Sequence, residues 1–286
     1  MSRLLTAASL GQALAALAEP NVKVLAGGTD LMIALRKARL EGGPKPDVLL
    51  DATRIPELRR LSLTGPEPFV GAAVTFHELE SDPSARELYP ALALAAASVG
   101  SAQIRRAGTL GGNAANASPA ADGVCALTML GARALLASRR GTRLLGLDGL
   151  IAAPYVNTLA DDELIVGFYL DAPARPSGQA FAKVGRRQAV AVARLNLAAS
   201  LDPDMAAPRL VLGACFPSPR RLEAVESFLA AEGASEAAFA EAGRMAAREF
   251  IRVCGRRSSA VYKVPAIEAL TARTLARAWG RLGGVQ

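Results

Sequence analysis

Two short segments carry paired glycines, and their residue types and spacing suit the binding of an anion. The first, LAGGTDL, occupies residues 25–31, and the second, GTLGGN, occupies residues 108–113. Glycine lets the backbone approach a ligand closely, and consecutive N–H groups in such turns form concave anion sites. Two such turns facing each other would suit the two phosphates of a dinucleotide. Neither segment is a Walker A loop or a G-x-G-x-x-G fingerprint, which excludes the two commonest ways of holding one.

The side chains beside these glycines add donors suited to phosphates. Thr29 and Thr109 offer hydroxyls, and Asn113 offers an amide. We predict that backbone N–H groups bind the diphosphate from two sides, donated by Gly27, Gly28, Gly111 and Gly112. Asp30 stands where it can cap the following helix, and a place beside the cofactor is compatible with that role.

Composition limits the classes of protein and partner. The 286 residues suit two domains or three small ones, and 51% are hydrophobic, which is enough for real cores. The 33 Lys and Arg against 26 Asp and Glu give a net charge of +7. The basic residues are scattered and the aromatics, at 5%, do not interleave with them, so a nucleic-acid stacking surface is not indicated. An anionic cofactor or an acidic protein partner accounts for the charge as well.

The same counts disfavour metal sites and nucleophilic triads. Cys125, Cys215 and Cys254 lie far apart in sequence with no C-x-x-C, so neither a zinc site nor a disulfide framework is indicated. His77 is the single histidine, which excludes multi-histidine metal sites. It occupies a polar position on a predicted short helix, and no Ser-His-Asp motif surrounds it. We therefore assign no catalytic residue and no metal to this chain.

The N-terminal residues run straight into a helical pattern, so we expect no secretory signal. The longest apolar run, residues 91–99, is too short for a bilayer, which needs about 20 residues. We expect a cytoplasmic protein with reduced thiols.

Hydrophobic periodicity and turn residues predict an α+β chain. The opening reads as a helix capped by Ser9 with Gln12 and ended by Pro20, a strand over 21–26, a helix after Asp30, and a strand over 48–50. Further strands are expected at 58–63, 69–73, 132–137, 143–147 and 163–170, and helices at 89–97 and 124–130. The C-terminal part reads as strands at 180–184, 190–201 and 209–215, then helices at 219–232, 235–248 and 258–282, the order of a small α+β domain.

Residues 172–178 are rich in proline and form the best candidate linker. We therefore predict a ligand-binding domain over residues 1–172, with parts 1–54 and 55–172, and a second domain over residues 177–286.

With both turns placed, the chain resembles the FAD-binding subunit of molybdenum hydroxylases, the family of carbon monoxide dehydrogenase medium subunits and xanthine dehydrogenase flavin subunits. The family motif A-G-G-T-D-L stands at residues 26–31. The longer motif Q-I-R-x-x-G-T-(I/L)-G-G-N-x-A-N-A-x-P-A-A-D stands at 103–122, and F-x-K-x-x-R-R stands at 181–187. The match in order and spacing covers most of the chain. The cysteine-bearing insertion that holds an extra iron–sulfur cluster in some relatives is not visible.

The resemblance implies a two-part FAD-binding domain of the vanillyl-alcohol-oxidase-like type, followed by a small α+β domain with an antiparallel sheet and helices. The implied FAD-binding residues are Val24, Leu25, Ala26, Gly27, Gly28, Thr29, Asp30, Leu31, Thr109, Leu110, Gly111, Gly112, Asn113, Asp122, Ile165 and Lys183.

Two charged residues of this set have different implied roles. Asp122 cannot serve the phosphates, because like charges repel, so we expect it to accept hydrogen bonds from sugar or ribityl hydroxyls. Lys183 is implied at the electron-rich edge of the flavin, where its ammonium would favour reduced, anionic flavin. Because Asp122 lies far before Lys183 in sequence, we expect Asp122 to affect FAD retention and Lys183 to affect the midpoint potential. Ile165 is implied beside the ring system, and Val24 and Leu25 at the edge of the first turn.

The resemblance also implies an electron-transfer subunit of a larger complex, a dimer of heterotrimers. A large molybdopterin subunit would hydroxylate the substrate, a small subunit with 2Fe-2S clusters would carry the electrons, and this chain would pass them through FAD to NAD or another acceptor. Two alternatives stay open: a self-contained flavin oxidase of the same fold, and a non-catalytic nucleotide-binding or assembly module. The sequence names neither the substrate nor the acceptor, and it does not decide whether Arg105 and Arg106 face a partner.

Overall fold

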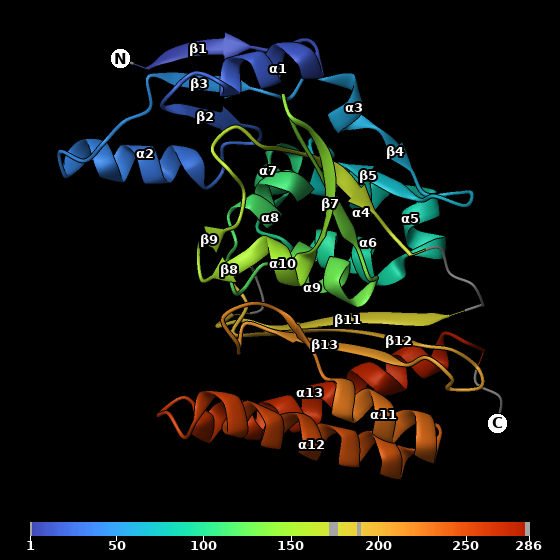
Figure 1. Cartoon of the computed structure of the whole chain (residues 1–286). Coiled ribbons are helices and arrows are strands. Elements are labelled where there is room, and N and C mark those ends of the chain that lie inside the picture. The colour runs from blue at the N-terminus through green and yellow to red at the C-terminus, as the bar shows by residue number, and fades with distance from the viewer. Residues whose placement is uncertain (1, 172–176, 188–189, 284–286) are drawn as a thin grey trace.

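Three main sheets of different construction follow one another along the chain (Figure 1). The computed structural model describes residues 2–171, 177–187 and 190–283. A small parallel sheet comes first, a five-stranded antiparallel sheet second, and a four-stranded antiparallel sheet backed by helices third. The predicted α+β class is confirmed. Among the described residues, no helix is both long and apolar enough to span a membrane.

The N-terminal tier alternates strands and helices. Its elements are β1 (Arg3–Thr6), α1 (Leu10–Leu17), β2 (Val22–Leu25), α2 (Leu31–Leu40) and β3 (Val48–Asp51). The strands are parallel in the order β1-β3-β2, and α1 and α2 lie on opposite sides of the sheet (Figure 1). The expectation that the chain enters directly into a helix is wrong. β1 pairs with β3 along its whole length, and four residues are too few for periodicity to reveal a strand.

The middle tier is built on the five-stranded sheet, with strand order β4-β5-β10-β6-β7. Its elements are α3 (Pro56–Arg59), β4 (Leu61–Ser62), β5 (Phe69–Gly71), α4 (Phe76–Ser81), α5 (Pro83–Leu88), α6 (Pro90–Ser98), α7 (Ala102–Ala107), α8 (Leu110–Ala115), α9 (Asp122–Met129), β6 (Arg133–Ser138), β7 (Gly141–Gly146), α10 (Leu147–Leu150), β8 (Ile151–Ala153), β9 (Val156–Asn157) and β10 (Leu164–Tyr169). The strand predicted at 58–63 is wrong in its first half. Pro56 stands at the start of a short helix there, a position that proline favours.

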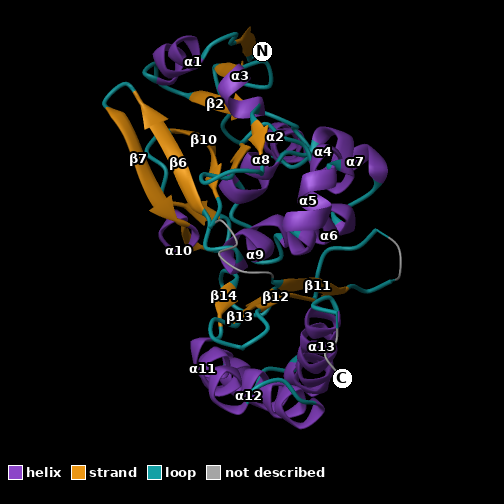
Figure 2. Cartoon of the chain, turned by 90° about the vertical axis from the view of Figure 1, so that its right-hand side faces the viewer, coloured by secondary structure: helices purple, strands orange, loops and turns teal. Residues whose placement is uncertain are grey.

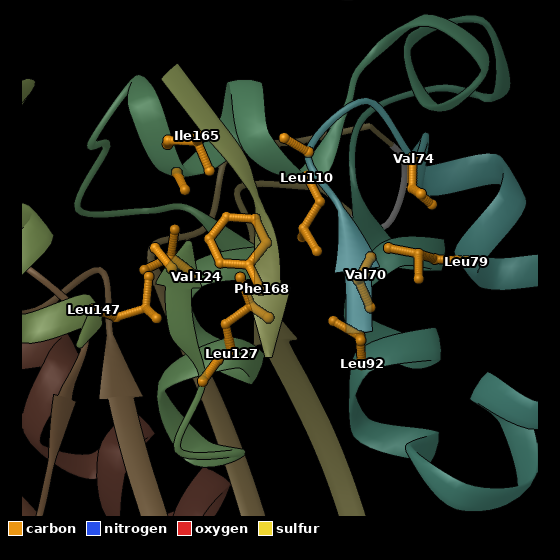
Figure 3. Close-up of a cluster of buried hydrophobic side chains, with 14 of the residues drawn as sticks. Val70, Val74, Leu79, Leu92, Leu110, Val124, Leu127, Leu147, Ile165 and Phe168 are labelled. Atoms are coloured by element: carbon orange, nitrogen blue, oxygen red, sulfur yellow. The ribbon is translucent and has the colours of Figure 1, made fainter. Parts of the chain in front are cut away.

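The core of the middle tier lies between this sheet and helices α6, α8 and α9. Leu92 on α6, Leu127 on α9, Val70 on β5 and Phe168 on β10 are all 0% exposed, and Figure 3 shows them gathered with their neighbours. Alanines fill much of the buried side of α6, which lets the neighbouring elements pack closely. This core fixes α8 and α9, the helices that carry the second glycine turn and Asp122.

The C-terminal tier is an antiparallel sheet in the order β11-β12-β13-β14, covered by helices on one face (Figure 2). Its elements are β11 (Gly178–Val184), β12 (Leu195–Leu201), β13 (Arg209–Gly213), β14 (Arg220–Arg221), α11 (Glu223–Glu232), α12 (Glu236–Cys254) and α13 (Ala260–Gly280). The three predicted closing helices are present, but the first begins at Glu223 and not at residue 219, because β14 occupies Arg220–Arg221. Residues 172–176 of the predicted linker lie outside the described residues, so the domain boundary stays a prediction.

The two faces of the C-terminal sheet pack against different cores. Ala180 and Ala182 on β11 join the core beneath the closing helices, while Phe181 between them joins the core of the middle tier. This alternation follows from the two-residue period of a strand. Lys183 therefore lies on the face turned toward the middle tier, and Asn196 pairs directly with it across β11 and β12. Polar groups from the two halves of the chain thus meet at this junction.

Candidate functional site

The first glycine turn joins the end of β2 to the start of α2, and its backbone donors are free. Gly28 has φ +68°, in the left-handed region that favours glycine. The backbone N–H groups of Gly27, Gly28, Thr29 and Asp30 have no acceptor among the described residues. Adjacent free donors at the start of a ten-residue helix form a ready site for an anion.

Asp30 does not cap α2 as predicted. It stands at the N-cap position, but its side chain makes no capping hydrogen bond. Its backbone is helical, with φ −102° and ψ −45°, rather than the extended conformation from which an N-cap side chain reaches back. The carboxylate instead lies 3.5 Å from the Thr29 hydroxyl. The Asp30 side chain therefore accepts no hydrogen bond from the N–H groups at the start of α2.

The two glycine turns lie against each other. A Cβ atom added to Gly27 would stand 1.9 Å from the carbonyl oxygen of Ala107 and 2.8 Å from the Cα of Gly108. Only glycine permits this approach. On the other side of the contact, a Cβ added to Gly108 would stand 3.6 Å from the Thr29 hydroxyl oxygen. The arrangement brings Thr29 and the start of the second turn to one place, as the sequence predicts.

The second turn has a different construction from the first. The N–H of Gly111 donates to Ala72 O at 2.9 Å, and the N–H of Gly112 donates to the Thr109 hydroxyl at 3.1 Å. Both glycines lie in α8, for which Thr109 is the N-cap. The prediction that these two N–H groups donate to a diphosphate is therefore wrong. A Cβ on Gly111 would stand 2.5 Å from the Cβ of Ala72, so this glycine serves close packing.

Side chains of the second turn keep the capacity to bind a ligand. The Thr109 hydroxyl accepts the cap hydrogen bond from Gly112, so its own proton remains available to donate. The Oδ1 atom of Asn113 is buried without a partner among the described residues. An unpaired buried acceptor is costly unless something fills the gap. Thr29, Thr109 and Asn113 therefore remain candidates as side-chain ligands.

Asp122 and Lys183 form one cluster at the junction of the two halves of the chain. The Lys183 ammonium lies 2.5 Å from Asp122 Oδ2 and donates to Ser98 O at 2.9 Å. The amide of Asn196 donates to Asp122 Oδ1 at 2.8 Å. The separation of Asp122 and Lys183 in sequence, on which their separate predicted effects rest, does not keep them apart in the fold, because β11 brings them into direct contact.

This cluster is buried, but some of its hydrogen-bond donors and acceptors remain unused. The Asp122 residue is 4% exposed, and burial raises the pKa of its carboxyl above the ordinary value, with the Lys183 ammonium opposing that rise. Lys183 uses two of its three donors, and each carboxylate oxygen of Asp122 has a second lone pair. One ammonium donor and carboxylate acceptor sites thus remain for a ligand.

The apolar residues of the predicted site lie at different depths. Leu110 and Ile165 belong to the middle core, at 0% and 4% exposed, and Ile165 lies near α8 in Figure 3. The remaining ones are half-buried along β2 and the first turn: Val24, Leu25, Ala26 and Leu31. The structure therefore brings the glycine turns together with their flanking strand and helix, and places Asp122 with Lys183.

Sequence reasoning missed Ser98 and Asn196, the two other partners of Asp122. Neither residue belongs to a motif that assigns it a role, and only the pairing register of β11 and β12 places Asn196 beside Lys183. Arg105, whose direction the sequence leaves open, lies 2.7 Å from Glu80. Its guanidinium also donates to the carbonyls of Val99 and Gly100. Arg105 therefore braces α7 within this chain.

A cavity of about 950 Å³ lies elsewhere, between the middle tier and helices α11 and α12. Its lining includes Arg221 and Arg252 but no residue of the glycine turns or of the Asp122 cluster. Arg221 is paired with Glu226, and Arg252 with Glu249. Because these two arginines are paired and the cavity lies away from both glycine turns, we do not assign the cofactor to it.

Comparisons with known proteins agree with this geometry. The family described as "FAD binding domain in molybdopterin dehydrogenase" matches residues 1–172. The nicotinate dehydrogenase FAD-subunit of Eubacterium barkeri is 37% identical over 172 residues, which span 59% of this chain and 57% of that protein. The caffeine dehydrogenase subunit beta of Pseudomonas sp. strain CBB1 is 31% identical over 96% of this chain and 93% of its own length.

A solved structure extends the likeness to the whole fold. Carbon monoxide dehydrogenase from Hydrogenophaga pseudoflava contains a chain that superposes with a TM-score of 0.87 and 27% identity, covering 98% of both chains. The same family assignment is supported by the glycine turns, by the α+β architecture and by the matched family domain. The chain belongs to the family of FAD-binding subunits of molybdenum hydroxylases, the oxidoreductases of the carbon monoxide and xanthine dehydrogenase type.

Proposed function

We propose that this chain is the electron-transfer subunit of its complex. Bound FAD would take electrons from 2Fe-2S clusters in a small partner subunit and pass them to NAD or another acceptor. A large molybdopterin subunit would oxidise the substrate, in a cytoplasmic dimer of heterotrimers. The observation that carries the proposal is the contact between the two glycine turns, with free N–H donors on one side and, on the other, the Thr109 hydroxyl proton and the Asn113 side chain, whose Oδ1 atom has no partner among the described residues.

The residues present fit FAD. Its diphosphate would lie on the free N–H groups of the first turn, from Gly27 to Asp30, at the positive end of α2. The Thr29 and Thr109 hydroxyls and the Asn113 amide would add donors from both turns, and the amide would also reach the ribityl chain. The second turn contributes side chains rather than backbone N–H groups, because those of Gly111 and Gly112 already have acceptors.

The charged cluster would serve the other end of the cofactor. FAD supplies the redox chemistry when it is bound. Lys183 would direct its remaining ammonium donor to the flavin edge, and Asp122 would accept from ribityl hydroxyls while holding Lys183 in place. Val24 and Leu25 would border the first turn, and Ile165 would lie beside the ring system from within the core.

Features of the described chain disfavour the two alternatives. A self-contained oxidase needs titratable residues to work on its own substrate. His77 instead lies on the exposed side of α4 and bonds Glu80. A purely structural module would not need free donors grouped at a helix start beside a second turn that fits against it. The whole-chain likeness to a carbon monoxide dehydrogenase chain favours the electron-transfer assignment.

The test is purification of the chain together with the products of neighbouring genes, followed by visible spectroscopy. We expect a flavin spectrum, with iron–sulfur and molybdopterin subunits in the same complex. Flavin without those partners would favour the oxidase, and a colourless, folded protein would contradict the proposal.

A matched pair of variants tests the first turn. Gly28 and Gly42 have nearly the same positive φ, +68° and +69°, but Gly42 follows α2 and has open space around it. Valine at either position bears the same backbone strain. We expect Gly28→Val to abolish FAD retention and Gly42→Val to retain it. Equal flavin content in both folded proteins would contradict the role of this turn.

A further inference from the structure

Asn196 is a wholly buried amide placed against the charged cluster. It is 0% exposed, and its Nδ2 atom donates to Asp122 Oδ1 at 2.8 Å. It stands on β12 directly opposite Lys183 on β11, so the two side chains lie on the same face of the sheet. The two carboxylate oxygens of Asp122 are thereby held by different partners, one by an amide and one by an ammonium.

We propose that Asn196 is a positioning residue for the cofactor site. From the C-terminal sheet it holds one oxygen of Asp122, while Lys183 holds the other, so the two charged groups keep one arrangement at the junction. The inference rests on the proposed function, because this arrangement affects electron transfer only when FAD lies beside Asp122 and Lys183.

Ser98 does not substitute for Asn196 in this task. Its hydroxyl oxygen lies 2.7 Å from Ala95 O but 3.3 Å from Asp122 Oδ2. A hydroxyl has a single proton, and the shorter contact to the Ala95 carbonyl takes it. Asn196 is therefore the principal neutral donor to Asp122, and an amide neutralises none of the charge that Lys183 meets.

Gly213 makes room for the Asn196 amide. The two residues pair across β12 and β13, and a Cβ on Gly213 would stand 2.2 Å from Asn196 Oδ1. That oxygen is buried without a partner among the described residues. The amide is thus held by its hydrogen bond to Asp122 and by a space that only glycine leaves open. A methyl group at residue 213 would displace it without touching any charged residue.

Removal of the amide changes the balance within the cluster. Asp122 would lose its neutral donor and interact more strongly with Lys183, the cation that remains beside it. The Lys183 ammonium would then be less available to a reduced flavin, so the midpoint potential should fall. We expect Lys183→Met, which removes the ammonium altogether, to change the potential in the same direction. FAD should also bind more weakly, because Asp122 would no longer be held for the ribityl hydroxyls.

Gln179 provides a matched control on the same sheet. It is 2% exposed, and its amide donates across the same junction to Leu88 O at 3.2 Å, away from Asp122 and Lys183. Asn196→Leu and Gln179→Leu each remove a buried amide that joins the two halves. Both should lower the melting temperature of the flavin-depleted protein. Only Asn196→Leu should alter the flavin.

The experiment compares wild type, Asn196→Leu, Gly213→Ala, Gln179→Leu and Lys183→Met by FAD titration and spectroelectrochemistry. We expect Asn196→Leu to raise the FAD dissociation constant about tenfold and to lower the midpoint potential, with Gly213→Ala changing both in the same direction. Gln179→Leu should keep both values. If Asn196→Leu does not fold, Gly213→Ala decides the matter.

The possible outcomes separate the two claims. Wild-type protein that takes up no FAD overturns the proposed function and this inference with it. A wild type that binds FAD, with potentials for the Asn196 and Gly213 variants equal to its own, overturns the inference alone. Equal changes in Asn196→Leu and Gln179→Leu also overturn it, because any buried amide at the junction would then serve.

Discussion

The two glycine turns look alike in sequence, yet they present their backbones differently. In the first turn, Gly27 and Gly28 leave their N–H groups without acceptors among the described residues. In the second, the N–H groups of Gly111 and Gly112 are already bonded to Ala72 and Thr109. The first turn therefore offers donors to a ligand, and the second provides a tightly packed wall that supports them.

The difference shows that a pair of glycines has two separate uses. Glycine can free backbone donors in a turn, or it can let two backbones approach within a core. The neighbouring residues decide between these uses. Thr109 caps α8 and takes up the Gly112 N–H, whereas Asp30 stands at the same relative position before α2 and makes no cap. Four substitutions should separate the two turns.

The largest effect is expected from Gly27→Ala. The new methyl group would overlap the Ala107 carbonyl, which is backbone and cannot rotate away. We expect the turns to separate and FAD affinity to fall about a hundredfold, at the upper end of overpacking costs of about 1–3 kcal/mol. Titration with FAD measures this. Gly11→Ala, on α1 with open space around it, is the control and should bind FAD as wild type does.

Gly111→Ala should act on stability first. Its methyl group would meet the Ala72 side chain and carbonyl inside the core, so we expect the free energy of unfolding to fall by about 1–3 kcal/mol. Denaturant titration of the flavin-depleted protein measures the change. An unchanged unfolding curve combined with lost FAD would show that Gly111 contacts the ligand, and the contrast between the turns would fail.

Thr109→Ala should cause a smaller loss of stability, together with a loss of affinity. Removal of an N-cap costs about 1 kcal/mol, and Ser235→Ala removes a comparable cap from α12, far along the chain. Both variants should lower the melting temperature by similar amounts. Only Thr109→Ala should weaken FAD, by several fold, because its hydroxyl proton is available to the ligand. Equal FAD affinities would restrict Thr109 to capping.

Gly112→Ala should have the smallest effect. The residue is exposed, lies within α8, and its new Cβ would meet only the Thr109 hydroxyl at 3.0 Å. Because alanine favours a helix by about 0.5–1 kcal/mol over glycine, we expect a small change in melting temperature and FAD affinity within about twofold of wild type. A large loss of FAD would mean that this N–H releases Thr109 and binds the ligand.

Local patterns predicted much of the fold and named the ligand-binding segments. Periodicity located α1, α6 and the closing helices, and turn residues located both glycine turns. Periodicity did not reveal the short elements: β1 has four residues, and α3 overlaps a predicted strand. The sequence pattern also did not predict which acceptor each backbone N–H group uses. Nothing in the letters Gly111-Gly112 reveals that Ala72 and Thr109 accept their protons.

The charged cluster shows the same limit at longer range. Asp122 and Lys183 both fall within motifs, but their contact depends on how the sheet that contains β11 and β12 packs against α6 and α9. Asn196 falls in no motif, and only strand register places it there. Such contacts join residues far apart in sequence, so a single sequence holds no local signal for them.

Hydrogen–deuterium exchange of the flavin-depleted and flavin-loaded protein tests the central contrast most directly. We predict that amides of residues 27–30 exchange rapidly without FAD and slowly with it, because the diphosphate becomes their acceptor. The amides of residues 111–113 should exchange slowly in both states, since their acceptors lie within the protein. Equal gains of protection in the two segments, or no gain at residues 27–30 in protein that holds FAD, would contradict the account.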